Sequence, residues 1–358
     1  MGESLEQVAH SLHDRLFVAN VHGDYGIEFA LEREEHQARA IVKNRYLPLL
    51  RDGGVNFEFY TVGGDHRIFT QDDDLTRGTF RSIDHALQEL EVESDESVIV
   101  RRFADIEDAR RAGKFAFLLT IEGAAPLQND LSILRNYYRL GLRSVILTWF
   151  KSNPSADGVA EERNGGLTNF GQELVREMNR LGMLIDICQC APQTVEDVLE
   201  ASTHPVISSH SNAAGLYDHP RNLTDSQLKK LAAGGGVIGV TSFPAHVGRG
   251  KVSIEDFLDH IDYITNLIGD DHLAIGLNIV VHKASRAQNF YRNSDIEYSD
   301  LWLPGLEDVD KMGAITLGLL KRGYGEDRIA KILGGNISRV LSQVLPAQSD
   351  APMEAAGA

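Results

Sequence analysis

The feature that most constrains this chain is a series of eight short apolar or β-branched runs, most of which end in Gly, Asn, Asp, Ser or His. The runs cover residues 16–24, 55–64, 115–123, 144–150, 183–189, 205–211, 236–243 and 272–280. Nearly continuous apolar runs of this length are typical of strands buried on both faces, as in parallel sheets. Eight such strands are what a closed (β/α)8 barrel requires.

The segments between the runs carry the spacing of helices. Apolar residues recur every three or four positions, as in 131–142, which predicts amphipathic helices that cover the sheet. Thr194, Thr224 and Ser253 each stand before such a segment and are expected to be N-caps. The alternation of strands and helices predicts an α/β fold of the (β/α)8 TIM-barrel type.

No internal repeat or second domain is evident, so residues 1–346 are expected to form a single barrel. The segments near 65–114 and 281–308 are longer than one connection needs, and we expect them to be βα-loop insertions over the active-site face. Residues 347–358 have the composition of a disordered tail.

Charge and apolar content limit the partners of the chain. Its 358 residues include 35 basic and 52 acidic side chains, a formal net charge of −17. A field of that sign repels phosphate backbones and anionic lipids, so neither nucleic acid nor membrane is expected as a partner. No apolar stretch reaches the roughly 18 residues of a membrane span, and the first residues lack the pattern of a secretory signal. We therefore expect a cytoplasmic location.

Polar residues gather where the runs end, and in this fold the active site lies at those carboxyl ends. The residues in question are His22 and Asp24, Glu122, Gln189, His210 and Asn278. An H-x-D pair such as His22 and Asp24 points to one face of a strand and suits a divalent metal. Such a pair alone is more often an ordinary hydrogen-bonded pair. Glu122 and His210 at equivalent strand ends favour the metal.

At this point the chain resembles the membrane (renal) dipeptidase family, metal-dependent hydrolases of the amidohydrolase superfamily. The resemblance rests on VHGD, LLTIEG, GLTNFGQELVREMNRLGMLID, VISSHSNA, DHPRNLTDSQL, HLAIG and GGNISRVL. These motifs follow one another in order and extend from about residue 12 to 345.

The resemblance implies two zinc ions bridged by one carboxylate. His22 and Asp24 would hold the first ion, and Glu122 would bridge the two. His210 and the strand-five residue, Gln189, would hold the second. A water shared by two such ions loses a proton readily and attacks the polarised amide carbonyl.

The resemblance also implies a substrate carboxylate bound by Arg221, a task that suits the planar fork of a guanidinium. From the residues alone, a structural role for Arg221 in its loop is about equally plausible. The substrate would then be a small molecule with a carboxylate. The family also suggests a homodimer.

Three residues depart from the family pattern. Gln189 and Asn278 replace a histidine and an aspartate, and Trp149 replaces a histidine. An amide oxygen is a poor zinc ligand compared with imidazole, and Asn278 cannot accept a proton from water. Trp149 removes a donor and adds a flat surface for substrate stacking. Other groups are conceivable substitutes, but none is assigned: Asp65, His66, Cys188, Cys190, His246 and His282.

Three functions remain open from the sequence. The first is a dipeptidase-like metallohydrolase acting on a dipeptide or N-acyl amino acid, with one ion or a weakened pair, catalytic residues Asn278 and His210, and substrate contacts from Arg221 and Trp149. The second is a repurposed enzyme that runs a lyase, isomerase or cyclising step on an amino-acid-derived metabolite. The third is an inactive homologue that only binds its ligand.

Overall fold

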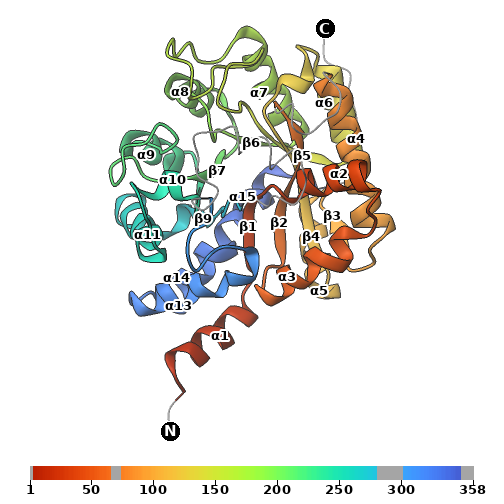
Figure 1. Ribbon diagram of the computed structural model, residues 1–358. Helices are drawn as coiled ribbons and strands as arrows, with labels where there is room; N and C mark the ends of the chain where they lie inside the picture. Colours follow the sequence, from red (N-terminus) through yellow and green to blue (C-terminus); the bar gives the residue numbers. More distant parts are fainter. Residues whose placement is uncertain (1–2, 66–73, 280–300, 348–358) are drawn as a thin grey trace.

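The computed structural model describes residues 3–65, 74–279 and 301–347. Its strands are β1 (Ala19–Gly23), β2 (Phe57–Gly64), β3 (Ser97–Ile99), β4 (Phe115–Glu122), β5 (Leu142–Ile146), β6 (Leu184–Asp186), β7 (Ile207–Ser211), β8 (Val237–Val240) and β9 (Leu273–Ile275). They form one parallel sheet in the order β2-β1-β9-β8-β7-β6-β5-β4-β3, and the pairing of β2 with β4 closes eight of them into a barrel (Figure 1). The predicted (β/α)8 barrel is therefore confirmed, because the eight closing strands fall on the eight apolar runs.

The ninth strand, β3, is absent from the sequence prediction. It pairs with residues 115–117, the amino-terminal half of β4, whereas β5 pairs with the carboxyl-terminal half of β4. Residues 75–112 thus add α4, β3 and α5 to the barrel, and β3 lies far from the carboxyl ends of the strands. Residues 66–73 and 280–300 lie outside the described residues, and with them a short part of the first expected insertion, most of the second and nearly all of the expected tail.

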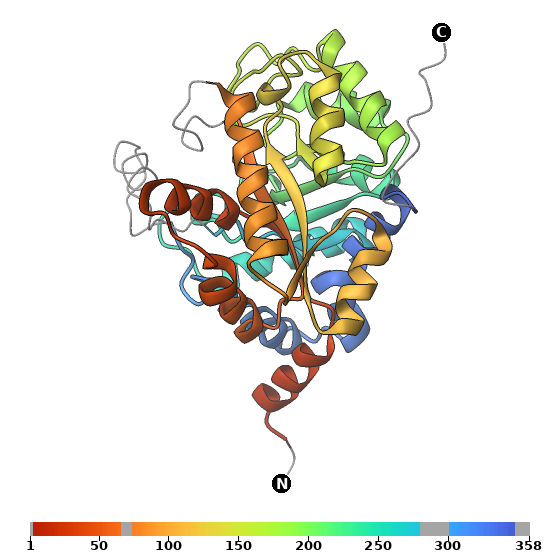
Figure 2. The ribbon, with the colours of Figure 1, turned by 90° about the vertical axis from the view of Figure 1, so that its right-hand side faces the viewer.

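Helices surround the barrel (Figure 2). The α-helices are α1 (Leu5–Arg15), α2 (Tyr25–His36), α3 (Leu47–Asp52), α4 (Leu75–Leu87), α5 (Phe103–Ala112), α6 (Leu131–Leu140), α7 (Asn169–Leu181), α8 (Pro192–Ala201), α9 (Asp225–Ala233), α10 (Pro244–Val247), α11 (Ile254–Ile268), α13 (Gly313–Lys321), α14 (Glu326–Ala330) and α15 (Asn336–Val344). The π-helical segments are η1 (Val42–Tyr46), η3 (Gln88–Val92) and η8 (Lys331–Gly335). The 3₁₀-helical segments are η4 (Ala125–Leu127), η5 (Asp270–His272) and η7 (Val309–Lys311). Among the described helices, none is long and apolar enough to cross a membrane.

Local sequence explains where several helices begin. Thr224 accepts a hydrogen bond from the Gln227 N–H in a capping box at the start of α9, and Ser253 occupies the same position before α11. Thr194 was expected to cap α8, but the helix begins earlier, at Pro192, because proline favours the first turn. The Thr194 hydroxyl instead donates to the Asp157 carbonyl.

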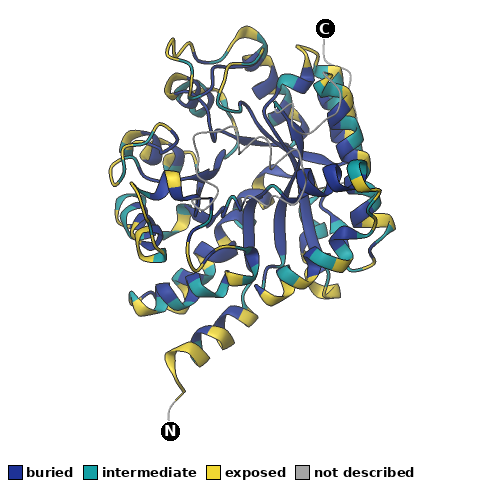
Figure 3. Ribbon diagram, in the orientation of Figure 1, coloured by how far each residue is buried: buried dark blue, intermediate teal, exposed yellow. Residues whose placement is uncertain are grey.

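The barrel interior is apolar at the amino-terminal ends of its strands. Ala19, Phe57, Ala116, Leu184 and Ile207 belong to one buried cluster, which residues of α15 also join. A second cluster lies between the sheet and the outer helices, so the strands are buried on both faces (Figure 3). Since apolar packing fills the amino-terminal end, polar side chains are left to gather at the carboxyl ends.

Candidate metal centre

The first polar pair of the site lies where β1 runs into α2. His22 is in β1 and is fully buried, whereas Asp24 immediately precedes α2 and keeps part of its side chain exposed. His22 Nε2 lies 3.3 Å from Asp24 Oδ1. The H-x-D spacing thus brings an imidazole and a carboxylate together at the carboxyl end of the strand.

Glu122 ends β4, and its backbone is held by the neighbouring strand. The Asp65 N–H donates to the Glu122 carbonyl at 2.9 Å. Gly64 permits this close approach: its φ is 143°, and a Cβ there would lie 1.9 Å from the same carbonyl oxygen. The short contact between the two chains therefore fixes the strand end that carries the carboxylate.

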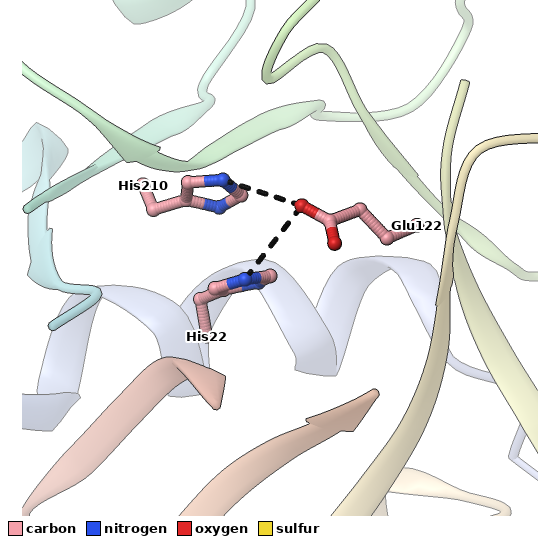
Figure 4. A group of neighbouring side chains, drawn as sticks. All are labelled: His22, Glu122 and His210. Atoms are coloured by element: carbon pink, nitrogen blue, oxygen red, sulfur yellow. Dashed lines mark ion pairs between the residues drawn. The ribbon is translucent and has the colours of Figure 1, made fainter. Parts of the chain in front are cut away.

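His22, Glu122 and His210 meet although they come from three strands far apart in the sequence (Figure 4). Glu122 Oε1 lies 3.9 Å from His22 Nε2 and 3.6 Å from His210 Nε2. The two imidazole rings stack, with centroids 3.7 Å apart. One donor atom from each residue lies within 4.8 Å of the other two, and all three residues are buried. Such a cluster of nitrogen and oxygen donors is suited to a divalent metal.

Gln189 also reaches this cluster. Its amide nitrogen donates to Glu122 Oε1 and lies 3.2 Å from His210 Nε2. Its amide oxygen is buried and has no hydrogen-bond partner among the described residues. The backbone of Gln189 is left-handed, with φ 64°, because β6 ends at Asp186 rather than running to residue 189 as the sequence suggested. Gln189 thus presents amide hydrogens, rather than a metal ligand, to Glu122 and His210.

The unpaired atoms of the site test whether a metal fits. Both ring nitrogens of His22 and the Oδ1 of Asp24 are buried without a hydrogen-bond partner in the described part of the chain. Burial of unsatisfied polar atoms costs free energy, and a bound cation would satisfy His22 Nε2 and Asp24 Oδ1 together. The residues therefore fit an ion held by His22, Asp24 and Glu122, and the donor set suits zinc.

The two stacked histidines differ in their affinity for a proton. Burial, His22, Arg221 and His246 hold the pKa of His210 well below its ordinary value, so His210 is neutral. Burial also disfavours the charged form of His22, but Asp24, Glu122 and Asp186 outweigh it and raise its pKa. His22 therefore lies in the more negative half of the site.

Arg221, which was expected to bind a substrate carboxylate, lies beside His210. It is buried, and its Nη2 donates to Cys188 Sγ at 3.2 Å and to the His210 carbonyl at 3.4 Å. Within the described residues it forms no ion pair, and its Nε has no partner. A cavity of about 170 Å³ is lined by Arg221, Gln189 and His219. A buried guanidinium without a counter-ion favours the binding of an anion.

Trp149 and Asn278 lie at the carboxyl ends of β5 and β9 but not in the cluster. The backbone N–H of Trp149 lies 3.3 Å from Asp65 Oδ2, and its indole packs edge-on against Phe150, whose ring lies under the Arg221 guanidinium. Asn278 is half-buried with φ 53°, and its side chain makes no hydrogen bond to His22, Glu122 or His210. Neither residue supplies a base next to the candidate metal position.

The conceivable substitutes within the described part of the chain do not replace the missing groups. Asp65 accepts hydrogen bonds from the Ala125 and Trp149 backbones and from Asn153, so it holds loops together. His246 is buried in α10 against His219 and Phe243, outside the metal cluster. The remaining candidates are Cys188 and Cys190, which are buried free thiols, and His66 and His282, which lie outside the described residues.

Two further groups near the site were missed from the sequence. Asp186 is fully buried at the end of β6, and its carboxylate accepts hydrogen bonds from the Cys188 and Ser209 backbones. The Ser209 hydroxyl lies 2.9 Å from His210 Nδ1. An acidic residue inside the apolar run MLIDICQ is the signal that could have identified Asp186, since a buried carboxylate needs partners.

The chain is similar to known proteins in its family pattern and in its sequence. The family model of the membrane dipeptidases, peptidase family M19, matches residues 6–283 and 293–354. Dipeptidase tcpJ from Claviceps purpurea (strain 20.1) is 34% identical over 272 residues, which cover 75% of this chain and 60% of that protein. Dipeptidase verJ from Clonostachys rogersoniana is 33% identical over 270 residues, with 75% and 65% covered. The chain thus spans less than two thirds of these two relatives.

Solved structures agree with the sequence comparison. An amidohydrolase from Pseudomonas aeruginosa superposes with a TM-score of 0.77 at 28% identity, over 94% of this chain and 99% of that one. The barrel, the cluster at its strand ends and the family match over most of the chain lead to one conclusion: the chain belongs to the membrane dipeptidase family, peptidase family M19.

Proposed function

We propose that this chain is a metal-dependent dipeptidase that hydrolyses the amide bond of a dipeptide or N-acyl amino acid, with a single metal ion on His22, Asp24 and Glu122. One observation carries the proposal. Among the described residues, the buried His22 Nε2 and Asp24 Oδ1 lie 3.3 Å apart and make no hydrogen bond, whereas Glu122 Oε1 and His210 Nε2 already contact the Gln189 amide.

In this account the amide group of Gln189 stands where a second ion would. Its two hydrogens can face Glu122 Oε1 and His210 Nε2 at once, and they satisfy lone pairs that would otherwise bind metal. A second ion would have to displace both contacts and accept an amide oxygen in return. Since that oxygen is a weaker zinc donor than imidazole, the second site is lost first.

The bound zinc ion would polarise the amide carbonyl and make its bound water more acidic. The chain's own groups do the rest. Arg221 binds the substrate carboxylate in the adjacent cavity through its free guanidinium edge. His210, neutral and buried, offers a polar contact that does not repel the ion. Trp149 gives the substrate an aromatic surface. Asn278 can form hydrogen bonds to the substrate but cannot take up a proton.

The neutral side chains at Gln189, Asn278 and Trp149 favour a second candidate. The same scaffold, with its carboxylate-binding Arg221, could run a lyase, isomerase or cyclising step on an amino-acid-derived metabolite. Such a step does not require a base that delivers water. The two candidates share the metal and the substrate carboxylate, and they differ in whether an amide bond is cleaved.

The test is an assay of the protein stripped of metal and then reloaded with zinc. It is offered a panel of dipeptides and N-acetyl amino acids, and products are identified by mass spectrometry. We expect amide cleavage that depends on zinc and is absent in Glu122→Gln. Metal-dependent products that do not contain the elements of an added water molecule would support the second candidate instead. No turnover of any compound, with ligand binding retained, would reject both and leave a binding protein.

The partners and compartment are likewise proposals. Charge argues against nucleic acid and membrane as partners, and a small molecule with a carboxylate fits Arg221. Two free cysteines are compatible with the reducing cytoplasm. A homodimer, suggested by the family, is tested by light scattering of the purified chain.

A further inference from the structure

Phe150 has a backbone conformation that a bulky side chain rarely adopts. Its φ is 55°, in the left-handed region, and across it the Lys151 N–H donates to the Trp149 carbonyl at 2.6 Å. A hydrogen bond between residues i and i+2 around a positive φ forms a γ-turn of the rare, strained kind. The turn follows β5, at the carboxyl end of the barrel. Backbone strain of this kind is retained mainly at functional positions, so the turn calls for a reason.

Contacts on both sides hold the turn in place. The Phe150 carbonyl accepts the Ala160 N–H at 2.7 Å, and a Cβ at Gly158 would lie 2.3 Å from the same oxygen. Glycine at this position therefore allows the loop to pass close to the turn. Before the turn, Asp65 Oδ2 accepts the Trp149 N–H at 3.3 Å. The surroundings thus fix the strained conformation.

The turn places the phenyl ring of Phe150 against Arg221. The ring centroid lies 5.1 Å from Cζ of the guanidinium, within the range of a cation–π contact. The indole of Trp149 packs edge-on against the same phenyl ring, with centroids 5.3 Å apart and planes at 84°. An aromatic face attracts a cation but does not neutralise it, so Arg221 keeps its charge in this contact.

The other contacts of the Arg221 side chain come from a thiol and a carbonyl. Its Nη2 donates to Cys188 Sγ at 3.2 Å and to the His210 carbonyl at 3.4 Å. Its Nε is buried and makes no hydrogen bond within the described part of the chain. Arg221 is only 4% exposed, so water stabilises its charge little, and a contact with an aromatic ring is stronger there than at the surface.

We propose that Phe150 is a positioning residue for the substrate carboxylate: its γ-turn holds an aromatic ring against Arg221 and stabilises the buried guanidinium without using its charge. This inference rests on the proposed function, in which Arg221 binds the carboxylate of a dipeptide or N-acyl amino acid. A carboxylate in the place of the ring would pair with Arg221 and compete with the substrate. An aliphatic side chain would leave the charge without this support. The ring therefore favours a substrate with a free carboxylate over its neutral amide.

Phe115 offers a matched control. Its ring centroid lies 5.6 Å from Cζ of Arg51, a similar contact. Phe115 is the first residue of β4, however, and so lies at the opposite end of the barrel from the site. Phe115→Leu and Phe150→Leu thus each remove an aromatic ring from beside an arginine, but only Phe150→Leu affects Arg221. Phe150→Tyr is the conservative variant, because it keeps an aromatic ring in the same turn.

The test measures carboxylate binding in metal-free protein, so it does not depend on catalysis. N-acetylglycine and its amide are titrated into each protein by calorimetry. We expect N-acetylglycine to bind roughly tenfold more weakly to Phe150→Leu, the effect of a cation–π contact with a buried arginine. Phe150→Tyr and Phe115→Leu should bind it as the unaltered protein does, and the amide should bind to all alike. In the zinc-loaded enzyme, Phe150→Leu should raise KM for a dipeptide and leave kcat unchanged.

Any of three results would overturn the proposal. They are an unchanged affinity of Phe150→Leu for N-acetylglycine, an equal weakening of the acid and its amide, and no binding of N-acetylglycine to the unaltered protein. Phe150→Asn repeats the test if Phe150→Leu does not fold, because asparagine tolerates a positive φ and lacks the ring. A failure of the dipeptidase assay with the expected binding would reject the proposed activity alone.

Discussion

The two halves of the site contrast in what their side chains can do. On one side, His22, Asp24 and Glu122 present ring nitrogen and carboxylate oxygens, and among the described residues the ring nitrogens of His22 and Asp24 Oδ1 make no hydrogen bond. On the other side, Gln189 and Asn278 present neutral amides. Under the proposed function, the contrast teaches that the barrel keeps the half that would hold one ion, while neutral amides replace the half that would hold a second ion and move protons.

The backbone marks the same division. Gln189 and Asn278 both have left-handed φ values, 64° and 53°. Asparagine tolerates this conformation, but glutamine does so at some cost, and such cost is retained mainly at functional positions. The direct contact of Gln189 with Glu122 gives a physical reason for it. The backbone of Gln189 keeps its left-handed conformation, and in this conformation the amide contacts Glu122 Oε1 and His210 Nε2.

The largest effect is expected from a substitution of Glu122, in the half of the site proposed to hold the ion. Glu122→Gln keeps the shape of the side chain but removes the charge that the ion needs. We expect loss of bound metal and a fall in kcat/KM on the order of 1,000-fold or more, because metal catalysis supplies several kcal/mol. Glu58→Gln is the control, since Glu58 is equally buried but contacts Tyr46 and Asn20. An active, metal-loaded Glu122→Gln would refute the assignment of this half.

Arg221 tests whether the cavity beside the two halves binds a carboxylate. Arg221→Ala should raise KM about 100-fold for a dipeptide, with a smaller change in kcat, because a buried charged hydrogen-bond pair is worth 2–5 kcal/mol, here taken at about 3. A dipeptide amide, which lacks the carboxylate, should bind equally weakly to both proteins. If Arg221→Ala weakened both substrates to the same extent, the arginine would have a structural role only.

Restoring the altered half should sharpen the contrast. Gln189→His offers a ring nitrogen in place of amide hydrogens, and Asn278→Asp supplies a group that can accept a proton. The double variant should bind a second ion and raise kcat about 10- to 100-fold, within the usual range of general base catalysis. Gln189→His alone should bind the second ion, and each single variant should raise kcat less than the double variant does. If the double variant stayed at the original rate, the loss of these two groups would not explain the altered site.

The last prediction concerns stability rather than catalysis, and a carboxyl group outside the proposed ion site. Burial raises the pKa of Glu58 from 4.5 to about 8, although hydrogen bonds from Tyr46 and Asn20 oppose this. Between these values the folded chain binds a proton that the unfolded chain has lost, so the free energy of unfolding falls as pH rises from about 5 to 8. Glu58→Gln should remove up to about 4 kcal/mol of that fall. Urea unfolding at pH 5.5 and 8.5 measures the fall in the free energy of unfolding for both proteins. An equal fall in Glu58→Gln and in the unaltered protein would contradict the prediction.

The sequence predicted the barrel because its signal is repeated eight times, whereas the three-residue β3 has no pattern of its own. It also predicted that His22, Asp24 and Glu122 lie close together, since strand ends meet at one edge of a parallel sheet. The position of the Gln189 amide depends on a left-handed turn after β6 and could not be read from alternation. The hydrogen bond from the Ser209 N–H to the Asp186 carboxylate depends on how β6 and β7 pair, which the sequence does not show.

The central claim is that one ion occupies the His22, Asp24 and Glu122 side while the Gln189 amide replaces a second. The most direct measurement is the zinc content per chain, by inductively coupled plasma mass spectrometry after saturation and removal of free metal, for the unaltered protein and Gln189→His. The account predicts one ion in the first and two in the second. Two ions in the unaltered protein, or none after zinc is supplied, would contradict it.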